Sequence, residues 1–326
     1  MKHLTWSARP ASGSARPEQA HGGTPISRRS VLLAAASAVV LRPAFAASDN
    51  LVERVDSKYN TILVYRRGNY VTMTFGYNRR LYTESVANTE DDLELPVTYT
   101  RYMTASLAYT QELDHILEIG FGGGRIAWYL HRHLPNVQVT SVELDDKVVE
   151  LSYKYFNVAP EDKFDIKIKD GRVFLMNIED KYNVILVDAY RGPFVPFHLM
   201  TKEFYSLARS RLRAGGVLAQ NVEPTTMLFD ASVATLQEVF EQVEFYVVGG
   251  NVVTVAYDGA RRNIADLRAH AQDQQRTYGF RYPLPDLLSA RRFLKGEPRH
   301  EALTDDFAPV EALRAIEQHN TKWVEP

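Results

Sequence analysis

Residues 116–124 read ILEIGFGGG, which is a short apolar run followed by a turn that contains four glycines. The apolar run predicts a buried strand, and the amphipathic segment after it predicts a helix over 125–134. Glycine lets the backbone turn sharply and approach a ligand closely. The segment therefore predicts a strand–turn–helix unit with its glycine turn at one edge of a sheet.

The same alternation of apolar strands and amphipathic helices continues on the C-terminal side. Strands are expected at 138–142, 164–168, 184–187 and 217–221, with helices at 146–156, 173–178 and 202–212 between them. A further helix at 231–242 and two apolar strands at 243–248 and 251–256 follow. The alternation predicts an α/β fold with a doubly wound, Rossmann-like parallel sheet.

The residues before the glycine turn have a different pattern. Segments 61–65 and 70–75 are rich in β-branched and aromatic residues and flank Arg67-Gly68-Asn69, which predicts a hairpin. A third strand is expected at 79–85, and 97–110 has helical spacing. We therefore divide the chain into a leader (1–46), an N-terminal β-rich domain (47–105), a Rossmann-like domain (106–260) that is expected to carry the ligand site at its strand ends, and a helical or irregular extension (261–326).

The first 46 residues have the composition of an export signal. Arg28-Arg29 precede a short apolar run that ends at Leu41, and Ala44-Phe45-Ala46 is a small-x-small cleavage pattern. This arrangement resembles a twin-arginine leader, and the other interpretation is a disordered tail followed by a short buried helix. The expected location is the periplasm, or the cytoplasm if the leader is not functional. The apolar run is shorter than the roughly 20 residues of a membrane span, so no stable insertion is expected after processing.

Composition excludes several classes of function. The 326-residue chain has 38 Lys and Arg against 40 Asp and Glu, with no Cys. This balance argues against nucleic acid as a partner, and disulfides, thiolate catalysis and Cys-based zinc sites are impossible. His131 and His133 are spaced so that they cannot share a helix face, so no metal site is expected.

Candidate site residues follow the predicted strands at their carboxyl ends, where ligands bind in such sheets. They are Gly120, Gly122, Glu143, Asp170, Gly171 and Asp188. Glu143 lies 23 residues after Gly120, at a spacing that suits a carboxylate accepting hydrogen bonds from ribose hydroxyls. Asp170-Gly171 lies where an adenine edge would be, which suits an S-adenosyl compound better than NAD.

Several motifs together resemble the spermidine synthase, or polyamine aminopropyltransferase, family. In order they are ILEIGFGGG at 116–124, VELD at 142–145, VVE at 148–150, KYF at 154–156, DGR at 170–172, VILVD at 184–188, GP at 192–193, EFY at 203–205 and GGV at 215–217. The match keeps order and spacing over about 105–222, and the upstream β-rich unit fits the family's small N-terminal domain.

The resemblance implies transfer of an aminopropyl group from decarboxylated S-adenosylmethionine to an amine such as putrescine, with release of methylthioadenosine. It implies that Glu143 holds the ribose, that Asp170 holds the adenine side, and that Asp188 is the acid–base residue beside the attacking amine. Further substrate contacts are expected from four residues: Asn60, Tyr190, Pro193 and Glu223. The family commonly forms homodimers or larger assemblies.

The chain departs from the family's pattern at Gly123, at Thr100 and at Ala189-Tyr190-Arg191. In the family these positions contact the charged aminopropyl group and the diamine. The sequence therefore does not identify the acceptor amine. Two alternatives also remain. One is an S-adenosylmethionine-dependent methyltransferase, in which Arg125 would suit a donor that keeps its carboxylate. The other is an exported nucleoside-binding protein without turnover.

Overall fold

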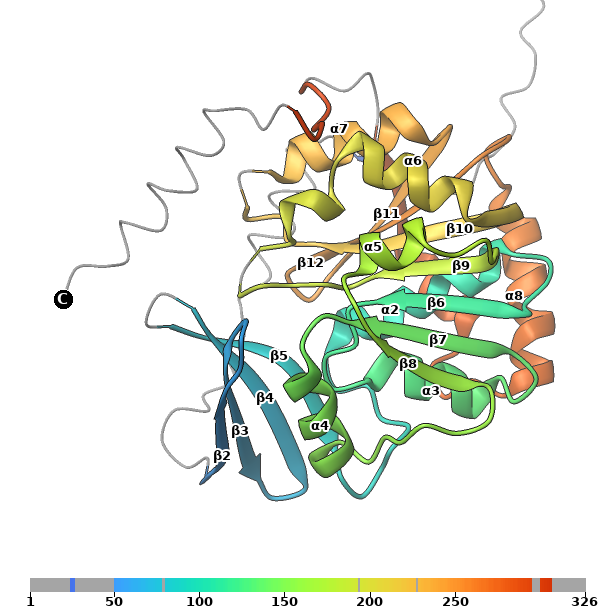
Figure 1. Cartoon of the computed structure of the whole chain (residues 1–326). Coiled ribbons are helices and arrows are strands. Elements are labelled where there is room, and N and C mark those ends of the chain that lie inside the picture. Colours follow the sequence, from blue (N-terminus) through green and yellow to red (C-terminus); the bar gives the residue numbers. More distant parts are fainter. Residues whose placement is uncertain are drawn as a thin grey trace, which may run out of the picture.

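Two β-sheets form the framework of the protein (Figure 1). The computed structural model describes residues 24–26, 50–77, 80–192, 194–226, 228–294 and 300–306. A four-stranded antiparallel sheet comes first in the chain, and a nine-stranded sheet with helices on both faces follows. Within the described ranges, no helix is both long enough and apolar enough to cross a membrane.

The small sheet has the strand order β2-β3-β4-β5. Its strands are β2 (Asn50–Asp56), β3 (Thr61–Arg67), β4 (Tyr70–Tyr77) and β5 (Arg80–Asn88). The predicted hairpin is confirmed, with Tyr65 paired to Thr72 across β3 and β4. β2 was not predicted, because most of its side chains are exposed and the strand lacks a clear apolar alternation.

The large sheet has the order β1-β13-β11-β12-β10-β9-β6-β7-β8. Its strands are β1 (Thr24–Ile26), β6 (His115–Ile119), β7 (Gln138–Glu143), β8 (Phe164–Ile168), β9 (Tyr182–Val187), β10 (Leu212–Val222), β11 (Gln242–Val248), β12 (Asn251–Tyr257) and β13 (Arg291–Leu294). Strands β6 to β10 are parallel, whereas β12 is antiparallel to both β10 and β11. The predicted Rossmann-like fold is confirmed, with a mixed rather than purely parallel sheet.

The strand order reverses between β6 and β9. From β6 the chain proceeds outward through β7 to β8, and β9 then returns to the other side of β6. Ligands of open α/β sheets bind beyond the carboxyl ends of the strands at such a reversal. The glycine turn after β6 and Asp188 after β9 both lie at this point.

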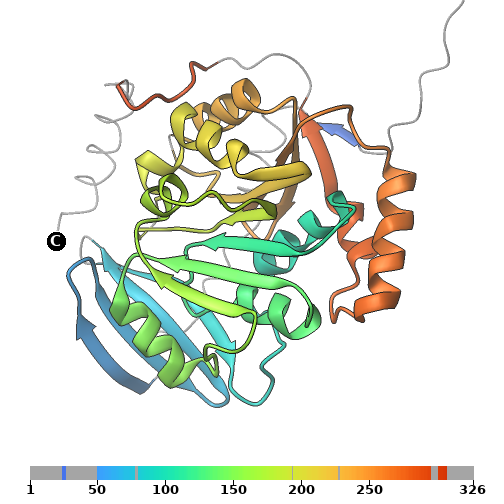
Figure 2. The same cartoon turned by 45° about the vertical axis from the view of Figure 1, so that its right-hand side comes forward.

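Helices cover both faces of the large sheet (Figures 1 and 2). They are α2 (Thr98–Met103), η1 (Thr104–Tyr109), α3 (Arg125–His133), α4 (Asp146–Tyr155), α5 (Gly171–Met176), η2 (Phe197–Leu199), α6 (Lys202–Ser210), α7 (Phe229–Val239), α8 (Ile264–Tyr278), α9 (Leu284–Leu287) and η3 (Leu288–Ala290).

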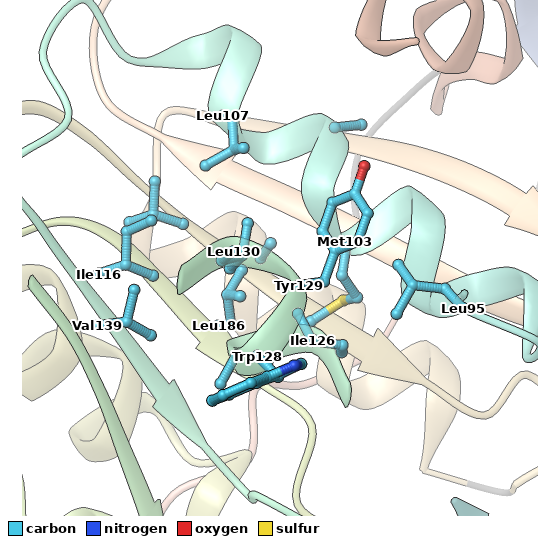
Figure 3. Close-up of a cluster of buried hydrophobic side chains, with 14 of the residues drawn as sticks. Leu95, Met103, Leu107, Ile116, Ile126, Trp128, Tyr129, Leu130, Val139 and Leu186 are labelled. Carbon is cyan, nitrogen blue, oxygen red and sulfur yellow. The ribbon is translucent and has the colours of Figure 1, made fainter. Parts of the chain in front are cut away.

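The two faces of the sheet contribute to two separate apolar cores because successive side chains of a strand point to opposite faces. In β6, Ile116 packs in the core that contains Met103, Ile126 and Leu130, which Figure 3 shows around α3. The next residue, Leu117, packs in the other core, which receives side chains from α6 and α7. Burial on both faces explains why these strands are continuous apolar runs in the sequence.

Some element boundaries differ from the sequence-based expectation. The helix expected over 173–178 begins earlier, at Gly171, because Asp170 caps it. The helix expected over 231–242 ends at Val239, since β11 begins at Gln242. The strand expected at 217–221 begins earlier, at Leu212, and its pairing with β9 shifts register between Leu212 and Val217.

β1, from the early part of the chain, and β13, from its late part, pair at one edge of the large sheet. β13, in the region expected to be an irregular extension, pairs with β11 and with β1, so part of this region belongs to the sheet itself (Figure 2). Of the expected leader 1–46, only Thr24–Ile26 is described, and the rest lies outside the described residues.

Candidate functional site

A cavity of about 400 Å³ lies at the carboxyl ends of β6, β7 and β9, and β5 of the small sheet forms part of its wall. Polar contacts hold the small sheet in this position. Glu53 on β2 accepts hydrogen bonds from Lys154 (2.6 Å) and Tyr155 on α4, and Ser85 on β5 accepts one from the backbone N–H of Gly123 (2.8 Å). A cavity of this size is in the range of small-molecule sites.

Most of the residues predicted from the sequence come together here. The cavity is lined by Asn60, Gly120, Gly122, Glu143, Asp170, Gly171, Asp188 and Tyr190. Glu223 is not among the lining residues, and its carboxylate accepts hydrogen bonds from Thr225 instead. Pro193 lies outside the described residues.

The glycine turn is shaped by its contact with the end of β9. Gly120 has a φ of +95°, and a Cβ atom there would lie 2.5 Å from the carbonyl oxygen of Asp188. The backbone N–H of Asp188 donates to the carbonyl of Ile119 (2.8 Å). Only glycine fits at position 120. Its lack of a side chain lets the glycine turn, which is expected to bind the nucleoside, pack against the backbone of Asp188.

Glu143 holds the glycine turn in place. One carboxylate oxygen accepts hydrogen bonds from the N–H groups of Phe121 (3.0 Å) and Gly122 (3.2 Å), and the other accepts from Leu144 (2.8 Å) and Asp145 (3.1 Å). Burial raises the pKa of Glu143, although these four bonds favour its charged form. The carboxylate therefore positions the loop in addition to facing the cavity.

Asp170 has two local partners. One oxygen caps α5 by accepting from the N–H of Val173 (2.9 Å), and the other lies 2.8 Å from Nε2 of His198. The hydrogen bond with His198 lowers the pKa of Asp170 from its usual value. His198 itself lines the cavity. The contact between His198 and Asp170 was not predicted from the sequence.

Asp188 stands at the end of β9 between two hydrogen-bond donors. Tyr99 donates its hydroxyl to Oδ2 (3.0 Å), and Asn221 donates its Nδ2 to Oδ1 (3.0 Å). Burial raises the pKa of Asp188 to about 6, against the lowering effect of both bonds. Such a carboxylate is ionised at neutral pH and is a stronger proton acceptor than an ordinary aspartate.

Asn221 and Tyr99 are neighbours of Asp188 that were not among the predicted site residues. Asn251 donates to the amide oxygen of Asn221 (3.1 Å), which fixes the amide so that its nitrogen faces Asp188. The hydroxyl of Tyr190 donates to the backbone carbonyl of Asn221 (2.9 Å). Asn221 ends the predicted strand 217–221, so its place at the same sheet edge as Asp188 was an available signal.

Arg125 does not have the role considered for it. Its guanidinium is buried and donates to the backbone carbonyls of Phe156 (2.9 Å) and Asp92. Trp128 donates to the Asp92 carboxylate (3.1 Å), which completes the packing of this loop. The guanidinium thus donates to backbone carbonyls of the fold instead of to a ligand carboxylate. This corrects the expectation, made for the methyltransferase alternative, that Arg125 would suit a donor that keeps its carboxylate.

The histidines on α3 are held by structural contacts. Nε2 of His131 lies 3.1 Å from a carboxylate oxygen of Glu161, and Nδ1 of His133 lies 3.4 Å from the carbonyl of Tyr278. No group of three or more potential metal ligands is found among the described residues.

Comparisons with known proteins agree with this arrangement. Residues 97–256 match the family model of the spermine/spermidine synthase domain. The chain is 30% identical over 221 residues to the polyamine aminopropyltransferase of Vibrio vulnificus, an alignment that covers 66% of this chain and 73% of that protein.

Two solved structures are similar in fold. A probable spermidine synthase from Corynebacterium glutamicum superimposes with a TM-score of 0.59 at 19% identity, covering 80% of this chain and 100% of that one. A spermidine synthase in complex with the transition-state analogue AdoDATO superimposes with a TM-score of 0.59 at 18% identity, covering 74% and 84%. At these identities the superpositions establish the fold.

Proposed function

The chain belongs to the spermine/spermidine synthase family, and on that premise we propose that it is a polyamine aminopropyltransferase. It transfers the aminopropyl group of decarboxylated S-adenosylmethionine to an amine such as putrescine and releases methylthioadenosine. The observation that carries the proposal is the position of Asp188, a half-buried carboxylate with a raised pKa that lines the cavity beside the glycine turn.

The reaction is a displacement at carbon. The lone pair of a neutral amine nitrogen attacks the aminopropyl methylene carbon that is bonded to the sulfonium sulfur. The carbon–sulfur bond breaks, its electron pair stays on sulfur, and methylthioadenosine leaves as a neutral thioether. The nitrogen becomes cationic and gives a proton to Asp188, which accepts it and stabilises the developing charge.

The charges around the cavity favour the decarboxylated donor. Glu84, Glu143 and Asp188 all contribute to the lining, and the decarboxylated donor carries only positive charges in its sulfonium and ammonium groups. A donor that kept its carboxylate would bring a negative charge to this lining, and the buried Arg125 is already bound to backbone carbonyls. We propose that Glu143 and Asp170 hold the nucleoside and that Asn60 and Tyr190 face the amine.

No metal is required for this transfer, because the positive charge of the sulfonium already activates the leaving group. The protein has only to exclude water, orient the two substrates and accept the proton.

The proposal is tested with the purified full chain. We expect methylthioadenosine to appear when decarboxylated S-adenosylmethionine and putrescine, or another amine from a panel, are both present, as measured by chromatography. Asp188→Asn is the control for the site. Methylation of an amine by intact S-adenosylmethionine, with no turnover of the decarboxylated donor, would overturn the proposal.

We further propose that the chain is exported to the periplasm. The support is the paired Arg28-Arg29, the apolar run up to Leu41 and the Ala44-Phe45-Ala46 pattern. Removal of 1–46 would leave 32 Lys and Arg against 39 Asp and Glu, a net charge of −7. Residues 1–50 fused to a reporter that is active only after export should give signal, and Arg28→Lys with Arg29→Lys should abolish it. Reporter activity confined to the cytoplasm would refute the proposal.

We also propose that the enzyme assembles as a homodimer or a larger homo-oligomer, because members of the family commonly form such assemblies. Light scattering of the purified chain should give at least twice the mass of one chain, and a monomer at micromolar concentration would refute this.

A further inference from the structure

Glu84 occupies an irregular position in strand β5. Thr83 pairs with Thr74 of β4 and Ser85 pairs with Met73, so Glu84 is an extra residue with no partner opposite it. A bulge of this kind redirects a side chain and is common beside active sites. Here it places Glu84 in the wall of the cavity.

The bulge is fixed against the glycine turn. The hydroxyl oxygen of Ser85 accepts the N–H of Gly123 (2.8 Å), and a Cβ atom at Gly122 or Gly123 would come within 3 Å of the Ser85 side chain. The residue before Ser85 is therefore held close to the turn that binds the nucleoside in the proposed function. The position of Glu84 follows from packing between the two sheets and is not that of a free surface residue.

One carboxylate oxygen of Glu84 has no hydrogen-bond donor among the described residues. This atom, Oε1, is buried. Burial and the nearby charges of Asp188 and Glu143 raise its pKa well above the usual value. The lining contains three Lys and Arg side chains: Arg125 is bound to backbone carbonyls, and Lys169 and Arg191 are exposed. A buried acceptor without a partner is costly, and a cationic N–H donor from a ligand would relieve that cost.

We propose that Glu84 binds the ammonium group of an alkylamine in this cavity and so contributes to selection of a cationic substrate. The inference rests on the proposed function. The ammonium has two sources with the same chemistry, namely the aminopropyl group of the donor and the far end of a diamine acceptor. These two sources are separated by experiment, because methylthioadenosine shares the nucleoside of the donor but lacks its ammonium group.

The experiment compares full-length Glu84→Gln with Glu112→Gln, which removes an exposed carboxylate in the loop before β6 that does not line the cavity. Calorimetry measures the affinity for decarboxylated S-adenosylmethionine and for methylthioadenosine, and the transfer assay gives KM for putrescine. Thermal unfolding without ligand is the fourth readout. Replacing a carboxylate whose buried oxygen has no donor should leave Tm unchanged or raise it, whereas loss of a structural contact would lower it.

If the donor supplies the ammonium, Glu84→Gln should weaken binding of decarboxylated S-adenosylmethionine by about 10- to 100-fold and leave methylthioadenosine unaffected. If the diamine supplies it, donor affinity should stay constant and KM for putrescine should rise by a similar factor. A variant that matches Glu112→Gln in all of these measurements overturns the inference, as does one whose Tm and methylthioadenosine affinity fall together. A wild-type chain that binds neither the donor nor the diamine refutes the proposed function as well.

Discussion

Asp188→Asn is expected to abolish transfer and at the same time to stabilise the protein at neutral pH. The pKa of Asp188 is raised from a usual value of 3.8 to about 6. At about 1.4 kcal/mol for each pKa unit, this rise corresponds to roughly 3 kcal/mol by which the ionised carboxylate destabilises the folded state. The amide carries no charge, and it can still accept from Asn221 while its nitrogen donates to the hydroxyl oxygen of Tyr99.

The stability gain has a defined pH dependence. Because the pKa of Asp188 is higher in the folded state, the folded protein binds more protons than the unfolded chain between pH 4 and pH 6, and wild-type stability falls as the pH rises through this window. The difference between Asp188→Asn and wild type should therefore be greatest above pH 6 and disappear below about pH 4. Its upper limit is about 3 kcal/mol in the free energy of unfolding.

Two assays measure the two effects. Denaturant unfolding at pH 8, pH 6 and pH 4 gives the stability difference, and release of methylthioadenosine gives the rate. The loss of a general base typically lowers the rate by about 100- to 10,000-fold. Affinity for methylthioadenosine should stay close to that of wild type, because in the proposed mechanism Asp188 acts on the amine. A stability loss at pH 8, or a rate within threefold of wild type, would refute the reasoning about this residue.

Four further substitutions probe the surroundings of the site. Tyr99→Phe removes a hydrogen bond that lowers the pKa of Asp188, so the acid limb of kcat/KM should move above pH 6, and an unmoved limb would contradict the assignment. Glu143→Gln presents an amide nitrogen to N–H groups of the glycine turn, and calorimetry should show at least tenfold weaker methylthioadenosine binding. Gly120→Ala should lower Tm markedly, because its Cβ would collide with the Asp188 carbonyl. Arg125→Met should also lower Tm, by leaving two carbonyls without donors, and should not change the preference for the decarboxylated donor.

The central sheet could be predicted because its strands are buried on both faces and so are continuous apolar runs. The central strands β6 and β9 belong most clearly to this class, whereas β8 at the edge of the sheet is partly exposed, and the glycine turn marks where β6 ends. β2 and β13 could not be predicted in the same way. β2 is largely exposed, and β13 is a short strand that completes the sheet through pairing with β11, which is distant in the sequence.

Site residues at strand ends could be predicted because the apolar strands that they follow could be predicted. Glu143 and Asp188 follow apolar runs directly, so the topology brings them to one edge of the sheet. Tyr99 and Glu84 reach the cavity from other elements. Tyr99 lies on the short helix α2, and Glu84 depends on a one-residue shift in pairing that no local pattern of β5 reveals. Contacts between separate elements decided these two positions.

Arg125 and Glu84 together show how charge in this cavity is arranged. The sequence places a basic residue next to the glycine turn and leaves glycine at 123, which suggested a site ready for an anionic group. In the folded protein the guanidinium of Arg125 turns to the carbonyls of Phe156 and Asp92, whereas the bulge in β5 turns a carboxylate toward the cavity. Backbone carbonyls thus bind the guanidinium of Arg125, and one carboxylate oxygen of Glu84 has no donor among the described residues. The lining therefore favours ligands whose charges are positive, which is the property that separates a decarboxylated sulfonium donor and its amine acceptor from intact S-adenosylmethionine.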